Sequence, residues 1–286
     1  MTERRERGAA GRWGRIRRER RARLAALAIA FIALLALIGP LVSPYAIDQL
    51  DWQHLAVGPG WASGHLLGTD RLGRDLLVRT LYGARVSLAI GITASLVSVL
   101  IGVSWGAIAG YLGARTDALM MRTVDVLNSL PYLFIVIVLT TLMGRGRPSV
   151  LFLAIGAVGW LTMARIVRGQ VLAIRHREYI EAAITAGAPT PHILVRHVVP
   201  NALGPVVAYA ALIVPQMILF ESFLSFLGLG VQEPLASLGS LIREGAQEMQ
   251  SAPWLLAAPA LLLLALLIGF NLLSDGLRDA LDPHED

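Results

Sequence analysis

The sequence predicts an all-α membrane protein with about six transmembrane helices. Of its 286 residues, 55% are hydrophobic and 16% are charged, and the mean hydropathy is +0.62. Charged residues make up about 25% of an average soluble domain. Six apolar runs approach or exceed the roughly 18 residues that a membrane-spanning helix needs. They cover residues 24–42, 86–111, 126–144, 150–167, 203–226 and 254–273.

The first run follows an arginine-rich tail, residues 1–23, in which ten arginines and three glutamates give a net charge of +7. We expect this tail to lie in the cytosol beside anionic membrane lipid. Nucleic-acid binding is the alternative, but the sequence shows no folded basic domain that would present such a surface. The run 24–42 is too long for a cleavable signal peptide, and its exit through Pro40 and Pro44 lacks a cleavage site.

The second run, 86–111, contains the pattern Gly102-Val-Ser104-Trp-Gly106, which matches the nucleophile elbow of serine hydrolases. That elbow requires a turn from a strand into a helix, whereas this pattern lies inside an apolar helix and continues at the same spacing to Gly110. Small residues every four positions let membrane helices approach closely. We therefore expect Gly102, Gly106 and Gly110 to pack against a neighbouring helix.

Two later runs contain polar or helix-breaking residues. Asn128 and Pro131 make 126–144 the weakest of the predicted spans. Glu221 is the one clear acidic residue in a predicted span, and ionisable residues inside a membrane are functional candidates by default. Glu221 either snorkels or caps near the outer end of its helix, or it lines a substrate path or gate.

The distribution of arginine predicts the orientation. All 25 basic residues are arginine; with the N-terminus inside, 18 of them fall on cytosolic segments and 7 on outer ones. Cytosolic loops carry the excess of basic residues. We therefore expect both termini and the connection at about 168–201 to face the cytosol, and the segment 43–85 to face outward.

The cytosolic connection is predicted to contain two short helices. Gly187 and Pro189 stop the first helix, Thr190 is the expected N-cap of the second, and Pro200 is expected to end it. A compact, capped unit of this kind at the membrane surface indicates a contact with a partner. The candidate contact residues are Glu181, Ala182, Ala183, Gly187 and Pro200.

Missing residue types exclude several activities. Without lysine the chain has no P-loop, so we expect no ATP hydrolysis by this chain and no enzymatic activity. Without cysteine it has no thiolate nucleophile, disulfide or cysteine-bound zinc. His54 and His65 lie in the predicted outer segment without an obvious third ligand, so we expect no metal site.

Four stretches resemble a known family. Glu181-Ala182-Ala183, with Gly187 and Pro200 following, resembles the EAA loop of ABC-importer permeases. The remaining motifs are similar to the dipeptide, oligopeptide and nickel permease family, over about residues 20–284, and most similar to its oligopeptide branch. They are HLLGTDRLGRD from His65, YGARVSL from Tyr82 and ESFLSFLGLGVQEPLASLG from Glu221.

The resemblance implies a type I ABC-importer permease fold in a bacterial cytoplasmic membrane, with a first helix and outer segment at 24–85 and a five-helix core at 86–286. It implies a subunit that moves oligopeptides by alternating access. The implied partners are a second homologous permease subunit, two ATP-binding subunits that carry ATP and magnesium, and an extracytoplasmic peptide-binding protein. Its EAA-like loop implies docking on the ATP-binding subunits.

Several alternatives remain open. A dipeptide or nickel permease belongs to the same family, although predicted spans without histidine or cysteine argue against a metal route. A self-sufficient channel or secondary transporter would be expected to show inverted repeats or several buried ionisable residues. An intramembrane enzyme would need a nucleophile and base at membrane depth.

Overall fold

The computed structural model describes residues 20–60, 63–143 and 148–281, so most of the arginine-rich tail lies outside the described residues. Within these ranges the chain is helical, without strands; one isolated bridge joins Thr69 to Asp75. The helices are α2 (Arg20–Val42), α3 (Leu76–Leu112), α4 (Ala114–Ser129), α5 (Tyr132–Met143), α6 (Pro148–Arg175), α7 (Glu178–Thr185), α8 (Thr190–Ile193), the π-helix η1 (Leu194–Val198), α9 (Val199–Phe226), α10 (Leu238–Gln247) and α11 (Trp254–Leu281).

Five helices are long and apolar enough to cross a membrane, namely α2, α3, α6, α9 and α11. The sixth predicted span, 126–144, is not one straight helix: α4 and α5 meet at an angle of 86°. The break falls at Leu130, whose φ of −79° and ψ of 141° are extended. Since Pro131 follows, a helical conformation at Leu130 is sterically disfavoured. The described part of the chain thus has five helices able to span a membrane, or six spans if the bent pair counts as one.

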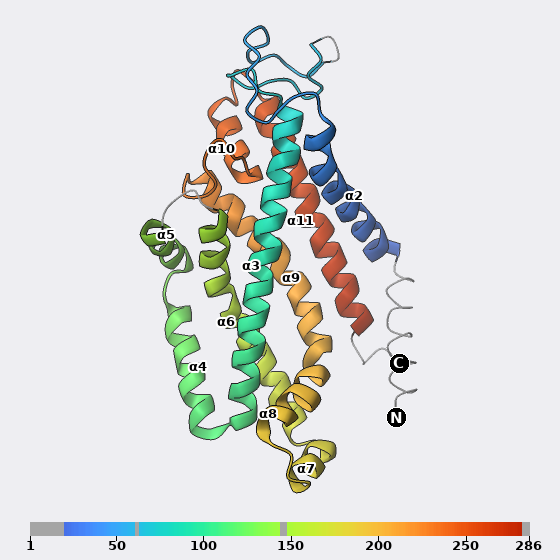
Figure 1. Cartoon of the computed structure of the whole chain (residues 1–286), viewed down its shortest axis with the longest axis vertical. Coiled ribbons are helices and arrows are strands. Elements are labelled where there is room, and N and C mark those ends of the chain that lie inside the picture. The colour runs from blue at the N-terminus through green and yellow to red at the C-terminus, as the bar shows by residue number, and fades with distance from the viewer. Residues whose placement is uncertain (1–19, 61–62, 144–147, 282–286) are drawn as a thin grey trace.

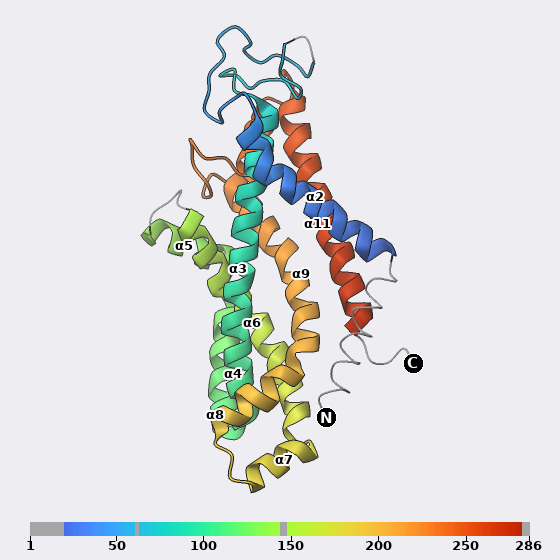
Figure 2. The ribbon, with the colours of Figure 1, turned by 45° about the vertical axis from the view of Figure 1, so that its right-hand side comes forward.

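Helix α3 lies at the centre of the bundle and packs along α6, with α9 and α11 also against it (Figures 1 and 2). Helix α2 lies across α11 and α3 on one side and leaves leucines such as Leu24 and Leu27 more than 60% exposed. Such apolar surface suits contact with lipid. The buried core consists of aliphatic side chains, including Ile90, Ile155 and Met163.

Helix α3 begins at Leu76, ten residues before the predicted apolar run, so a division of the chain between residues 85 and 86 falls inside a helix. Asp75 caps it by accepting a hydrogen bond from the amide of Val78 at 2.8 Å. At about 1.5 Å per residue, 37 residues span about 55 Å, well beyond the ~30 Å of a membrane core. The helix therefore connects two ends of the molecule: segment 43–75 with α10 at one, α7 and α8 at the other (Figure 1).

Candidate functional site

The α7–α8 hairpin, residues 178–193, lies at the lower end of the bundle in Figure 1. Its turn is built on Gly187, whose φ of +78° lies in the left-handed region. The amide of Gly187 donates to the carbonyl of Ile184 at 2.9 Å, and the amide of Ala188 donates to the carbonyl of Ala183 at 3.1 Å. These two bonds form a Schellman motif, which favours glycine at this position. The turn between the two helices therefore has a fixed geometry.

Two isoleucines anchor the hairpin to the bundle. Ile180 and Ile193 are 0% and 1% exposed and belong to the main core cluster. Other apolar side chains of this region face outward: Tyr179, Ile184 and Val195 are 39%, 52% and 73% exposed. Exposed apolar side chains gathered at one end of a protein are typical of a contact surface.

The predicted contact residues occupy different places around this turn. Glu181, Ala182 and Gly187 are exposed, and Ala183 is half-buried against the core. A Cβ atom added to Gly187 would meet nothing within 4 Å, so the surface beside it is open. Pro200 is exposed as well but lies in α9, beyond the hairpin.

The structure corrects the prediction for the second helix. Pro189, and not Thr190, is the N-cap of α8. Pro200 does not end a helix: the chain continues through η1 into α9, and the amide of Val199 donates to the carbonyl of Leu194, five residues back. This wider turn places Pro200 in the first turn of α9, where a missing amide hydrogen leaves no bond unmade.

The glycines of α3 lie against α6. A Cβ atom on Gly106 would collide with the carbonyl oxygen of Ala164, and one on Gly110 would lie 2.9 Å from the Cβ of Val171. Gly102 meets the same helix one turn earlier. The absence of side chains at these positions lets the two backbones approach closely, as in other packed membrane helices.

Glu221 is fully buried, at 0% exposure. One carboxylate oxygen accepts a hydrogen bond from the Oγ of Ser87 at 2.6 Å, and the other accepts one from the Oγ of Ser225 at 2.7 Å. The amide of Leu238 donates in turn to the Oγ of Ser87 at 3.2 Å. The snorkelling interpretation is therefore wrong, because the carboxylate joins α9 to α3 and α10 instead of reaching water. A gating role would require these three helices to separate.

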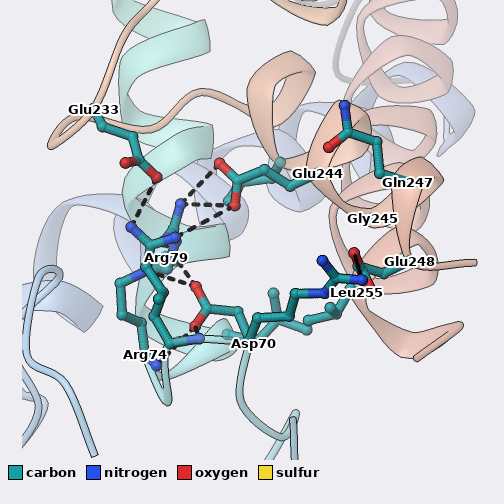
Figure 3. Close-up of a pocket in the computed structure, with 13 residues that line it drawn as sticks. Asp70, Arg74, Arg79, Glu233, Glu244, Gly245, Gln247, Glu248 and Leu255 are labelled. Atoms are coloured by element: carbon teal, nitrogen blue, oxygen red, sulfur yellow. Dashed lines mark hydrogen bonds and ion pairs between the residues drawn. The ribbon is translucent and has the colours of Figure 1, made fainter. Parts of the chain in front are cut away.

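A network of charged residues connects α10 to the segment before α3 (Figure 3). The Oδ2 of Asp70 accepts hydrogen bonds from Arg74 Nε at 2.6 Å and from Arg79 Nη1 at 2.9 Å. The Nη2 of Arg79 donates to both carboxylate oxygens of Glu244, at 3.1 and 3.0 Å, and Arg74 Nη1 donates to Glu233 at 2.9 Å. Arg79 is 2% exposed, so its charge depends on these partners.

The network borders a pocket between residues 70–79 and α10. Burial raises the pKa of Glu244 to about 7, and the charge of Arg74 acts in the opposite direction. Neutralisation of Glu244 would weaken its attraction to Arg79. The pocket therefore lies against the ion pair of Arg79 and Glu244.

A second group of polar residues at this end, Asp51, His54 and His65, was not recognised as a group from the sequence. Asp51 lies between His54 and His65, and one potential ligand atom from each residue falls within 4.8 Å of the others. The sequence around His54 and His65 shows no recognisable third ligand, because the path of the loop that brings Asp51 to them cannot be inferred from residue spacing. The expectation of no metal site rested on that missing ligand.

Comparison with known proteins identifies the family. The family model described as "Binding-protein-dependent transport system inner membrane component" matches residues 102–285, which is more than half of the chain. The chain belongs to this family. A second family model, the N-terminal TM domain of oligopeptide transport permease C, matches residues 10–59. The five or six apolar helices agree with a multi-pass protein of the inner membrane.

Individual relatives are similar over most of their length. The oligopeptide transport system permease proteins OppC of Haemophilus influenzae and Escherichia coli K12 are each 50% identical over 248 residues. That alignment covers 87% of this chain and 79% and 82% of theirs. The dipeptide transport system permease protein DppC of Bacillus subtilis is 46% identical over 247 residues, covering 86% of this chain and 76% of that protein.

The two matched regions cover different parts of this inner-membrane transport component. The longer match, from residue 102 onward, includes the α7–α8 hairpin, Glu221 and α10. The shorter match includes α2 and the loop that carries Asp51 and His54. Both regions contribute to the end of the bundle at which α10 meets segment 43–75, so this end is assembled from distant parts of the chain.

Proposed function

We propose that this inner-membrane component is the permease subunit of an ATP-driven oligopeptide importer. Relatives named as oligopeptide permeases, at 50% identity over 87% of the chain, support the substrate class. Partner subunits supply ATP hydrolysis with bound magnesium, because a chain without lysine has no P-loop. The complex holds a second homologous permease subunit, two ATP-binding subunits and an extracytoplasmic peptide-binding protein.

The α7–α8 hairpin is the proposed docking element for an ATP-binding subunit. The observation that carries this proposal is a rigid, anchored hairpin whose outer face leaves Tyr179 and Ile184 exposed. By the positive-inside rule, the arginine-rich segments of a membrane protein face the cytosol. The hairpin end and both termini therefore face the cytosol in this proposal. Segment 43–75 and α10 then face outward, where the binding protein delivers peptides.

The hairpin is well placed to pass motion to the membrane helices. It is joined to α6 on one side and, through η1 without a break, to α9 on the other. Helix α9 carries Glu221, whose carboxylate accepts a hydrogen bond from Ser87 of α3. A displacement of the hairpin by ATP-driven closure would therefore move α9 against α3, as alternating access requires.

A charge reversal tests the docking surface. We expect Glu181→Lys to abolish co-purification of the ATP-binding subunits and ATP-driven uptake, while the permease stays in the membrane. Asp48→Lys makes the same charge change on an exposed residue at the other end of the molecule and should leave co-purification intact. Normal association and uptake by Glu181→Lys would contradict this assignment.

Uptake by the reconstituted complex tests the substrate. Proteoliposomes that contain all subunits and the cognate binding protein should accumulate a labelled pentapeptide in an ATP-dependent way. The similarity to DppC of Bacillus subtilis makes dipeptides the second candidate, so a labelled dipeptide and nickel are compared in parallel. Dipeptide uptake alone would move the chain to the dipeptide branch, and nickel uptake alone would overturn the peptide proposal. Uptake without ATP-binding subunits would instead indicate a self-sufficient transporter.

A further inference from the structure

Three side chains with metal-ligating atoms converge in segment 43–75, outside the helical bundle. The Oδ2 of Asp51 lies 2.9 Å from His54 Nδ1 and 3.5 Å from His65 Nε2. All three atoms lie within 4.8 Å of one another. Ligands about 2.1 Å from a tetrahedral zinc ion are separated by about 3.4 Å, so the observed separations are close to those of a metal site.

His65 is held in the orientation of a metal ligand. It is 1% exposed, its Nδ1 lies 2.8 Å from Oδ2 of Asp75, and its ring stacks on Tyr45 with centroids 4.4 Å apart. Metal-binding histidines usually donate their second ring N–H to a carboxylate in this way, which fixes the tautomer. With the proton on Nδ1, the Nε2 atom presents its lone pair toward Asp51.

The backbone around the other two ligands is fixed independently of their side chains. Thr69 Oγ1 donates to the carbonyl of His54 at 2.5 Å, and the amide of Asp51 donates to the carbonyl of Gly73 at 3.3 Å. The Oδ1 of Asp51 accepts a hydrogen bond from the amide of Gln53 at 3.0 Å, which leaves its Oδ2 directed toward the two histidines. The site is thus assembled before any ligand arrives.

We propose that Asp51, His54 and His65 bind one divalent transition-metal ion, of which zinc is the best match to the donors. Two imidazole nitrogens and one carboxylate oxygen are the protein ligands of zinc sites in which water fills the fourth position. The side chains of Asp51 and His54 are 29% and 36% exposed, so water can fill the fourth position. The ion joins loop 51–54 to the segment that caps α3, and so stiffens the face opposite the α7–α8 hairpin.

The site is tested by cobalt titration of the full-length chain, purified in detergent through a tag without histidine. Tetrahedral Co²⁺ gives visible absorption bands, so binding is read directly and without a transport assay. We expect one saturable Co²⁺ per chain, displaced by Zn²⁺. Loss of a supporting carboxylate around a metal site weakens binding by about 10- to 100-fold, so His54→Ala and Asp51→Asn should each weaken it by at least about 100-fold.

The controls separate this site from other histidines and from damage to the fold. His192→Ala removes a histidine whose ring lies 6.0 Å from that of His197 at the other end of the bundle, and Asp48→Asn makes the same acid-to-amide change in the same loop. Both should keep full Co²⁺ binding. Asp51→Asn retains the side-chain oxygen that accepts from the amide of Gln53, so it decides the question if His54→Ala does not fold. No saturable binding, or binding unchanged by both ligand variants, would overturn the proposal and leave Asp51, His54 and His65 as a hydrogen-bonded group that binds no metal.

Discussion

The two ends of the bundle are stabilised in opposite ways. At the end formed by segment 43–75 and α10, charged side chains bind one another: Arg74 reaches Glu233, and Arg79 reaches Glu244, across 159 and 165 residues of chain. At the α7–α8 hairpin, the turn is held by backbone bonds between residues at most five apart. Among the described residues, the carboxylate of Glu181 is in no ion pair.

This difference separates an end whose buried charges are paired within the molecule from an end whose apolar side chains are exposed. Buried charges need partners within the molecule, because an unpaired charge in a dry environment is costly. Exposed apolar side chains such as Ile184 and Val195 gain stability when a partner covers them. We therefore expect substitutions at the first end to act on folding, and substitutions at the hairpin to act on assembly.

The largest expected effect is at Arg79. Arg79→Met would remove the most deeply buried counter-charge of Asp70 and Glu244 and leave only Arg74 beside them. Breaking a buried pair costs about 3–5 kcal/mol. We expect about 3 kcal/mol, the lower limit of this range, because Glu244 is 36% exposed and water screens part of its charge. Unfolding of the detergent-solubilised chain measures the loss.

Arg71→Met is the matched control. Arg71 pairs with Glu248 at the same end, but its side chain is 70% exposed. Exposed ion pairs contribute at most about 1 kcal/mol. Equal losses for the two variants would show that burial does not decide the stability of this end.

How much of each end could be predicted follows from the same contrast. The end of α7 at Gly187 depends on neighbours within a few residues, and the sequence predicts it. The ion pair of Arg79 with Glu244 and the hydrogen bond of Ser87 with Glu221 join helices that are far apart in the chain. No local pattern shows that α10 folds back over Glu221, so the sequence placed this carboxylate near water when it is in fact enclosed.

The two prolines at Pro131 and Pro200 behave differently from the prediction. Pro131 was expected only to weaken the span 126–144, and the helix breaks there, with α4 and α5 at 86°. Pro200 was expected to end a helix. At Pro200 the preceding π turn changes the hydrogen-bond register, and the helix continues. The packing of η1 and α9 decides between these outcomes, and Val198 at 0% exposure shows how closely η1 is packed.

An intermediate effect is expected between the two ends, at the glycines of α3. Gly106→Leu would force a side chain into the backbone of α6, and overpacking a core costs about 1–3 kcal/mol. Gly169→Leu in α6 is the control, since a Cβ there meets nothing within 4 Å. Thermal unfolding of the isolated permease should show a loss for the first variant and none for the second. Unchanged stability of Gly106→Leu would mean that α3 and α6 can move apart at little cost.

The smallest effect on stability, and the sharpest separation of folding from assembly, is expected at Gly187. Its φ of +78° is tolerated by asparagine but strained by about 1–2 kcal/mol for most other residues. Since an added Cβ atom here meets nothing within 4 Å, Gly187→Asn should fold normally, while Gly187→Val distorts the turn locally. Co-purification of the ATP-binding subunits then reports on the hairpin alone.

If the partner requires only the turn geometry, Gly187→Asn keeps the subunits bound and Gly187→Val loses them. If the partner's backbone lies against the glycine itself, both variants lose them, and retention by both would exclude the hairpin turn from the docking surface.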